Sequence, residues 1–409
     1  MNSRRAFLKF SAAGLAVASG VRWPESAIAA ADLGPPALPA GTLQSAELVK
    51  LDGKVALIKK SFRPPNFETP VSYFNEAFTP NNAFFVRYHL AGIPRVDAAQ
   101  WKLSVSGESL EKPFELTYDS LRKDFEIVEV PAVCMCSGNR RGLSQPHVTG
   151  VQWGHGAIGN AKWRGVRLRD VLIRSGLKKD ALEIVLGGAD SAVLDKTPDF
   201  VKSLPVWKAM DENTLVAFEM NGEALPHWNG FPARIVVPGW TATYWMKHVT
   251  SISVVAQPFK GFWMNPAYRI PKGKFPVIDR FVSQETDTNT PITEMVVNSL
   301  ITSPANGAKI SRGESVNIAG VAWDGGYGIA AVEVSEDEGR VWQPAIMGAD
   351  LGRYAWRPWS HRFSPRAPGR HVLLARATNK AGTTQTMELI FNPAGYHNNV
   401  LQRIELEVI

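Results

Sequence analysis

Cysteine is scarce in this sequence: the 409 residues contain only two, Cys134 and Cys136. A disulfide between residues two apart would strain the bridge, even in an oxidising compartment where cysteines usually pair. Two cysteines also cannot complete a tetrahedral zinc site without a second pair or suitably spaced histidines. We therefore expect at least one of the two thiols to have a function other than a disulfide or a zinc site.

Three further features are missing from the sequence. It has no Cys-x-x-Cys-His motif for covalent haem, so we expect no haem in this chain. Beyond the N-terminal region there is no apolar run of the roughly 20 residues that a membrane-spanning helix needs. No Lys/Arg run is interleaved with aromatic residues, which disfavours a nucleic acid as partner. What remains is ordinary globular composition, 45% hydrophobic and 20% charged, in a chain long enough for two or three domains.

The N-terminal region has the pattern of an export signal. Arg4 and Arg5 precede an apolar stretch over 10–17 and a small-residue zone over 27–31. This is typical of a twin-arginine signal peptide over residues 1–31; the alternative, a short membrane anchor, is disfavoured because the apolar stretch is too short. Residues 1–31 contain four Lys/Arg and one Glu, so without them the formal charge falls from +7 to +4. The twin-arginine route exports folded proteins, so the leader predicts a periplasmic protein and favours a bound cofactor.

Short apolar or alternating runs dominate the first part of the chain, after a Pro/Ala/Gly-rich linker over 33–39. They predict strands over 83–90, 101–106, 126–133 and 181–186, with a helix over 168–175. Because no regular βαβ order is visible, we expect a mixed α+β domain over residues 32–290.

A polar stretch over 284–293 marks the expected domain boundary. The runs that follow are separated by turn residues and predict strands over 300–301, 315–322, 329–335, 354–359, 371–377 and 385–392. This pattern is typical of an immunoglobulin-like β-sandwich over residues 291–409, with no cysteine pair between its sheets.

The segment from Val133 to Gly142 carries the densest chemistry. Cys136 stands at the end of a predicted strand, in front of a Gly/Asn turn that contains Arg140 and Arg141. Neighbouring guanidinium groups lower the pKa of a thiol, and a thiolate is a soft ligand for a transition metal. The alternative is an inert core thiol, and the residues of this segment alone leave the two possibilities about equal.

The segment Cys136-Ser-Gly-Asn-Arg-Arg141 closely resembles the metal-binding segment of the sulfite oxidase family of molybdenum enzymes. Further blocks match that family in the same order: Phe84 to His89, Trp153-Gly154 with Gly156-Ala157-Ile158, His227, Gly230 to Arg234, Val237-Pro238-Gly239, Lys247 and Tyr268. The resemblance covers nearly all of the chain after the leader, and is nearest to the molybdenum subunit of bacterial sulfite dehydrogenases. The chain departs from animal members at Tyr88, where they commonly have Asn, and at Trp228-Asn229, and it has no cytochrome b5 or flavin domain.

The resemblance implies a role for each matching residue. Cys136 would be the only protein ligand of molybdenum, which a molybdopterin cofactor would hold. Arg87 and Tyr268 would line an oxyanion pocket, with Trp153 as its wall and Arg141 as a nearby cation. The remaining implied residues are Arg357, which the second domain would lend to the pocket, and His89, Asp190, His227, Arg234 and Lys247, which would hold the pterin and its phosphate. Each of these taken singly is equally typical of a strand face, a core or a surface, so only their joint order carries the prediction.

The implied activity is oxidation of sulfite to sulfate, with electrons passed singly to a c-type cytochrome, either a subunit or a soluble cytochrome c. The implied assembly is a homodimer or a heterodimer with the cytochrome. Two alternatives stay open: an exported molybdenum-dependent sulfoxide reductase of the same superfamily, and a non-enzymatic exported binding module. A Gly-x-Gly-x-x-Gly pattern over 154–159 is rejected as a dinucleotide site, because no strand leads into it and no helix pattern follows.

Overall fold

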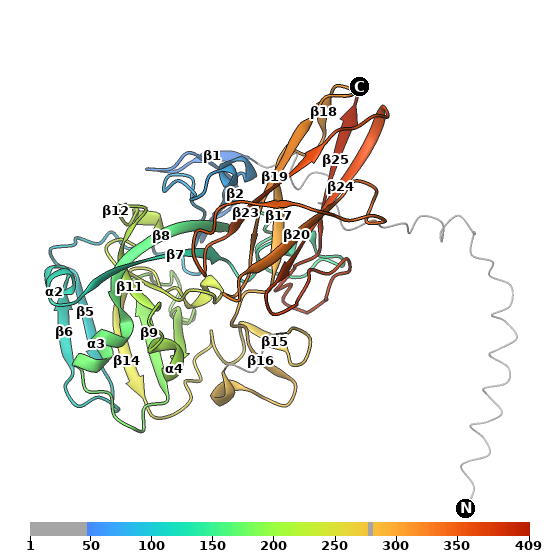
Figure 1. Ribbon diagram of the computed structural model, residues 1–409. Helices are drawn as coiled ribbons and strands as arrows, with labels where there is room; N and C mark the ends of the chain where they lie inside the picture. The colour runs from blue at the N-terminus through green and yellow to red at the C-terminus, as the bar shows by residue number, and fades with distance from the viewer. Residues whose placement is uncertain (1–46, 277–280) are drawn as a thin grey trace, which may run out of the picture.

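The computed structural model describes residues 47–276 and 281–409 (Figure 1). The leader expected over 1–31 and the linker expected over 33–39 lie outside these residues. Strands far outnumber helices, and the chain forms a mixed domain followed by a β domain, which is drawn in orange and red in Figure 1. Within the described part of the chain, no helix is long and apolar enough to cross a membrane.

Two sheets form the centre of the first domain. One has the strand order β10-β9-β14-β5-β6, in which the β14–β5 pair is parallel, and the other has the order β12-β11-β8-β7 with β13 beside β11. The strands of the first sheet are β5 (Lys102–Ser106), β6 (Phe114–Thr117), β9 (Glu183–Gly188), β10 (Val201–Pro205) and β14 (Val249–Val255). Those of the second are β7 (Ile127–Met135), β8 (Ile158–Arg167), β11 (Leu215–Met220), β12 (Glu223–Ala224) and β13 (Arg234–Val236).

Short helices and a smaller sheet complete this domain. The α-helices are α2 (Tyr118–Lys123), α3 (Leu168–Arg174) and α4 (Val206–Ala209), and the 3-10 helices are η3 (Val71–Asn75), η4 (Arg141–Leu143), η5 (His227–Asn229), η6 (Ala242–Tyr244) and η7 (Val282–Gln284). The smaller sheet contains β1 (Leu48–Lys50), β2 (Ala56–Phe62), β3 (Pro65–Glu68) and β4 (Val86–Arg87), and β15 (Arg269–Pro271) pairs with β16 (Asn289–Pro291).

The local sequence explains several of these elements. In α3, Leu168, Val171 and Leu172 are buried at helical spacing, and the chain turns away at Gly176 with a φ of 70°. Helix α2 begins at a capping box in which Thr117 and Ser120 satisfy each other's backbone N–H groups. The strand predicted over 83–90 is much shorter than expected, since only Val86–Arg87 pairs with β3.

The second domain consists of two sheets packed around an apolar core. One sheet has the order β17-β19-β23-β22 and the other β18-β25-β24-β20-β21. Their strands are β17 (Asn298–Ser303), β18 (Ala308–Ile310), β19 (Val316–Trp323), β20 (Ile329–Ser335), β21 (Gln343–Pro344), β22 (Ile346–Met347), β23 (Arg357–Phe363), β24 (Gly369–Asn379) and β25 (Gln402–Val408).

The prediction of a strand over 385–392 is wrong. Met387 and Phe391 are 50% and 45% exposed, and only isolated bridges occur at Thr384 and Thr386. Side-chain hydrogen bonds hold the two ends of the segment instead: the Gln385 amide donates to the Asn298 side chain at 2.9 Å, and the Asn392 amide donates to Tyr396 O at 2.8 Å. The last strand of the sheet is β25. Strands β18 and β25 were not predicted from the sequence.

The two domains meet beneath the end of β7. Val133 and Met135 of β7 share one apolar cluster with Leu300, Val321 and Trp356 of the second domain. The Val133 N–H donates to the carbonyl oxygen of Tyr354 at 2.9 Å. The loop that follows β7 is therefore supported from both domains.

Candidate active site

The loop that follows β7 places Cys136 on the wall of a partly enclosed cavity. Cys134 lines the same cavity, because residues two apart on a strand face the same side, and both cysteines are buried and free. The Cys136 N–H donates to Ala157 O at 2.9 Å, and the Asn139 side chain accepts from the Ala157 N–H at 3.0 Å. These bonds fix the sulfur of Cys136 against β8.

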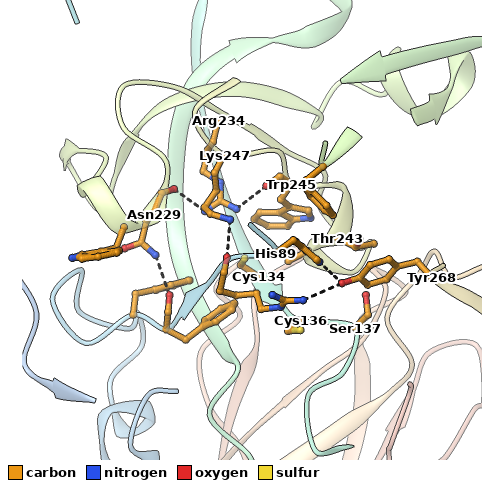
Figure 2. Close-up of a pocket in the computed structure, with 16 residues that line it drawn as sticks. His89, Cys134, Cys136, Ser137, Asn229, Arg234, Thr243, Trp245, Lys247 and Tyr268 are labelled. Carbon is orange, nitrogen blue, oxygen red and sulfur yellow. Dashed lines mark hydrogen bonds between the residues drawn. The ribbon is translucent and has the colours of Figure 1, made fainter. Parts of the chain in front are cut away.

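Arg87, His89 and Tyr268 line the same cavity as Cys136. Figure 2 shows His89, Tyr268 and Cys136 among its lining residues. The Arg87 guanidinium donates to the Tyr268 hydroxyl at 3.4 Å and lies within hydrogen-bonding reach of the Cys136 sulfur. His89 Nε2 forms a short hydrogen bond with the same hydroxyl, and its ring stacks on Phe200 at 3.7 Å. Burial, reinforced by the Arg87 charge, lowers the pKa of His89 well below its usual value, so this imidazole is neutral.

Lys247 and Arg234 form a basic wall on the other side of the cavity. The Lys247 ammonium donates to the carbonyl oxygen of Arg87 at 2.7 Å and lies 4.1 Å from the centre of the Tyr88 ring. Burial lowers the pKa of Lys247 to about 8, although the Asp190 carboxylate opposes the shift. Arg234 donates to the carbonyl oxygens of Asn229 and Trp245 at 3.0 and 3.2 Å, so two backbone groups set its direction.

Several buried polar atoms of this cavity form no hydrogen bond within the protein. Arg87 Nε, Arg234 Nε and Thr243 Oγ1 are buried without a hydrogen-bond partner. The lining contains three cations and two thiols, and no carboxylate among the described residues. Buried donors without partners are costly, and cations and thiols match a phosphate and a soft metal. The residues therefore fit an anionic cofactor that carries a transition metal.

An outer hollow opens on the opposite side of Cys136. Arg87, Cys136 and Tyr268 line both this hollow and the inner cavity, so they form the wall between them. Arg141 lies in the outer hollow, where its guanidinium donates to Ala394 O at 2.8 Å and to Val151 O at 3.2 Å. An anion that enters from solvent would meet Arg141 and then Arg87.

Comparisons with known proteins agree with this arrangement. The family model of the oxidoreductase molybdopterin binding domain matches residues 89–263, and that of the Mo-co oxidoreductase dimerisation domain matches residues 289–409. Sulfite oxidase from chicken (Gallus gallus) is 35% identical over 340 residues, which cover 80% of this chain and 72% of the chicken protein. The chain belongs to the sulfite oxidase family. As a member of this family it binds the molybdenum-molybdopterin cofactor.

Other relatives extend the comparison. Mitochondrial sulfite oxidase of the rat (Rattus norvegicus) is 33% identical over 87% of this chain, which spans 66% of the rat protein's length. Nitrate reductase [NAD(P)H] of barley (Hordeum vulgare) is 30% identical over 88% of this chain and 42% of its own length. The crystal structure of the sulfane dehydrogenase SoxCD from Paracoccus pantotrophus superposes with a TM-score of 0.72 at 24% identity, over 95% of both chains, and so has the same fold.

Most residues predicted from the family resemblance come together at the two cavities. The inner cavity is lined by Arg87, His89, Cys136, Arg234, Lys247 and Tyr268, and Arg141 lines the outer hollow. His89 was predicted to hold the pterin, and the structure adds a direct bond to the substrate-side Tyr268. Arg140, one of the two arginines expected beside Cys136, instead donates to the Asn298 side chain at 2.9 Å, so Arg87 is the cation beside the sulfur.

Four predicted residues line neither cavity, and three of them, Trp153, His227 and Asp190, belong to the first domain. Trp153 is completely buried in the core, and its carbonyl oxygen accepts from the Gly142 N–H, so the structure gives no support for it as a wall of the pocket. His227 is half-buried on η5 with its ring beside Trp228, and neighbouring Asn229 takes the cavity position. Asp190 acts on the cavity only through the charge of Lys247.

The prediction that Arg357 reaches the pocket is wrong within this chain. Arg357 begins β23 and donates to Gly348 O at 2.8 Å and to the Asp350 carboxylate at 3.1 Å. It lines a separate hollow of the second domain, together with Arg353 and Lys380. The second domain contributes Tyr396 to the outer hollow instead, through the loop that Arg141 holds.

Thr243, Asn229 and Tyr396 also line the cavities and were not predicted from the sequence. No motif singles them out, because their positions depend on loops that tertiary contacts shape. The Gly154 to Gly159 pattern leads directly into strand β8. No helix follows it directly, in agreement with the prediction that it is not a dinucleotide site. In residues 47–276 and 281–409, no three His, Cys, Asp or Glu side chains are grouped as metal ligands.

Proposed function

We propose that this protein is a sulfite dehydrogenase, which oxidises sulfite to sulfate and passes the electrons singly to a c-type cytochrome. In the reaction sulfite gains one oxygen atom that is ultimately replaced from water, and two protons and two electrons are released. Two molecules of oxidised cytochrome c would each accept one electron.

The observation that supports this proposal is the shared wall of Arg87, Cys136 and Tyr268 between the two cavities. The inner cavity suits the molybdenum cofactor and the outer hollow suits a small anion. The two meet at the thiol of Cys136. Sulfite oxidases of rat and chicken are the relatives with the highest identities quoted above, and their names state this substrate.

The residues of the chain would bind and orient the anion. Arg141 at the outer hollow attracts it, and Arg87 at the shared wall fixes its oxygens by charge-assisted hydrogen bonds. The Tyr268 hydroxyl, held by Arg87 and neutral His89, directs a further hydrogen bond toward the same position. When bound, the molybdenum cofactor supplies the oxygen atom for transfer and takes up both electrons.

Location and assembly are part of the proposal. The twin-arginine pattern over residues 1–31 supports export of the folded, cofactor-loaded protein to the periplasm, where c-type cytochromes occur. The match of residues 289–409 to a dimerisation domain supports a dimer, either of two copies of this chain or with the cytochrome.

The test is a steady-state assay of protein exported from a host that makes the molybdenum cofactor. Sulfite should reduce cytochrome c only when the protein is present, and the molybdenum content should approach one atom per chain. Nitrate and a sulfoxide, each supplied with a reduced electron donor, should give turnover at least about a hundredfold slower. Faster turnover of nitrate or sulfoxide than of sulfite would contradict the proposal, and a molybdenum content near zero would favour a binding module.

A further inference from the structure

A loop of the second domain, residues 392–396, carries Tyr396 into the outer hollow. The Asn392 side chain holds Tyr396 at both backbone groups: its oxygen accepts from the Tyr396 N–H at 3.0 Å, and its amide donates to Tyr396 O at 2.8 Å. At Gly395, where φ is 59°, a Cβ atom would lie 2.4 Å from Val148 and 2.9 Å from Arg141. The loop is therefore built to approach Arg141 closely, and only glycine fits at that point.

The ring of Tyr396 packs between groups of the site. It is stacked on the ring of Tyr268, with centroids 5.5 Å apart and planes 10° from parallel, and the Arg141 guanidinium lies 5.2 Å from its centre. The side chain is 92% buried, since the residue is only 8% exposed. Tyr396 thus adds an aromatic wall that the first domain does not supply.

The hydroxyl of Tyr396 has no hydrogen-bond partner among the described residues. Its electrostatic neighbours are Tyr268, Arg141, Cys136 and Arg87, which are the groups of the shared wall and the hollow. Burial raises the pKa of Tyr396 far above its usual value, so the hydroxyl stays protonated and can act only as a neutral donor or acceptor. A protonated donor without a partner, beside two guanidinium groups, is suited to an oxyanion.

We propose that Tyr396 is a substrate-binding residue, which donates a hydrogen bond to the oxyanion in the outer hollow and limits the hollow to small oxyanions. The identity of the substrate as sulfite rests on the proposed function, whereas the binding of an oxyanion does not. The second domain would thereby complete the binding site, with a neutral tyrosine at the place where the sequence had suggested an arginine.

The experiment compares Tyr396→Phe with wild type, both loaded with cofactor, by calorimetric titration with sulfate and by steady-state kinetics with sulfite. Phenylalanine keeps the stacking on Tyr268 and removes only the hydroxyl. Loss of a hydrogen bond to a charged ligand should weaken sulfate binding and raise the KM for sulfite about tenfold, with little change in kcat. Tyr73→Phe, on η3 and outside both cavities, is the matched control and should leave both values unchanged.

A second variant tests the limit on size. Tyr396→Ala should bind benzenesulfonate more tightly relative to sulfate than wild type does, because the ring no longer narrows the hollow. Unchanged sulfate binding in Tyr396→Phe, no measurable sulfate binding in wild type, or an unchanged preference in Tyr396→Ala would each overturn the proposal. If sulfate binding depends on Tyr396 but sulfite is not oxidised, the oxyanion site stands and the proposed function fails.

Discussion

The ammonium of Lys247 donates a hydrogen bond to the backbone carbonyl oxygen of Arg87 at 2.7 Å. This bond joins the basic wall of the cofactor cavity to the segment that carries the substrate-side arginine. The same ammonium lies over the Tyr88 ring, whose hydroxyl bonds His248 Nε2 at 2.7 Å. We therefore expect Lys247 to couple cofactor binding to substrate binding.

Replacing this lysine should affect both functions. In Lys247→Met, we expect the affinity for the cofactor to fall by at least about tenfold, because a cation that holds a buried anion is lost. The molybdenum content after dialysis should fall as a result. The remaining loaded enzyme should show a raised KM for sulfite, because the Arg87 carbonyl loses its donor. Lys247→Arg is the charge-matched control for cofactor content. Metal analysis gives the molybdenum content, and steady-state kinetics gives the KM for sulfite. A Lys247→Met variant with full molybdenum content and an unchanged KM would disprove the coupling.

Arg87 should act on substrate and not on the cofactor. In Arg87→Met, the KM for sulfite should rise about a hundredfold, since charge-assisted hydrogen bonds to the anion are lost in a partly buried site. Molybdenum content should match wild type, because Arg234 and Lys247 form the rest of the basic wall. A KM equal to that of wild type would remove Arg87 from the substrate pocket.

Arg357 gives the opposite prediction. Its guanidinium is bound by Asp350 and lines a separate hollow, so Arg357→Met should change kcat and KM for sulfite by less than about twofold. The same assay applied to Arg141→Met should show a clear rise in KM, because Arg141 lines the outer hollow. A tenfold rise in KM for Arg357→Met would mean that this arginine reaches a pocket in the assembled protein.

Three buried histidines should make the protein sensitive to acid. Burial lowers the pKa values of His155, His248 and His397 to about 3, against roughly 6.5 in an unfolded chain. As pH falls through 6.5 the unfolded state takes up protons that the folded state does not, so stability is complete above about pH 6.5 and is lost toward pH 3.

His397 is suited to a test of this pH dependence, because both ring nitrogens lack partners and its φ of 54° also suits asparagine. The melting temperature of wild type should fall as the pH is lowered from about 7 to 5. The melting temperature of His397→Asn should fall by less, because one such histidine contributes up to about 1.4 kcal/mol of stability per pH unit. His147→Asn, at an exposed position, should follow wild type. Parallel curves for wild type and His397→Asn would contradict this assignment.

The sequence predicted the centre of the site better than its edges. Alternation along extended chain predicted that Arg87 and His89, and likewise Cys134 and Cys136, face the same side. All four line one cavity, although His89 and Cys136 lie just beyond the ends of β4 and β7. Tyr396 could not be found in this way, because its position depends on the loop that Arg141 fastens at Ala394. The prediction for Arg357 was wrong for a related reason, because the local sequence around this arginine does not show which carboxylate pairs with it.

The same contrast holds for the fold. Strands β5, β9 and β20 and helix α3 follow from their apolar patterns, and their buried faces agree with those patterns. The strand predicted over 385–392 was wrong because tertiary hydrogen bonds hold only its first residues: the Gln385 amide donates to the Asn298 side chain, and the Thr386 carbonyl oxygen accepts from the Leu401 N–H. The immunoglobulin-like character of the two-sheet domain stays a prediction.

The most direct test of the account is the number of sulfur atoms bound to molybdenum, measured by X-ray absorption on wild type, Cys136→Ser and Cys134→Ser. If Cys136 is the protein ligand, Cys136→Ser should show one sulfur neighbour fewer than wild type and should lose sulfite-dependent reduction of cytochrome c. Cys134→Ser should keep the full sulfur count. An unchanged count in Cys136→Ser, or a count that falls in Cys134→Ser instead, would contradict the central claim.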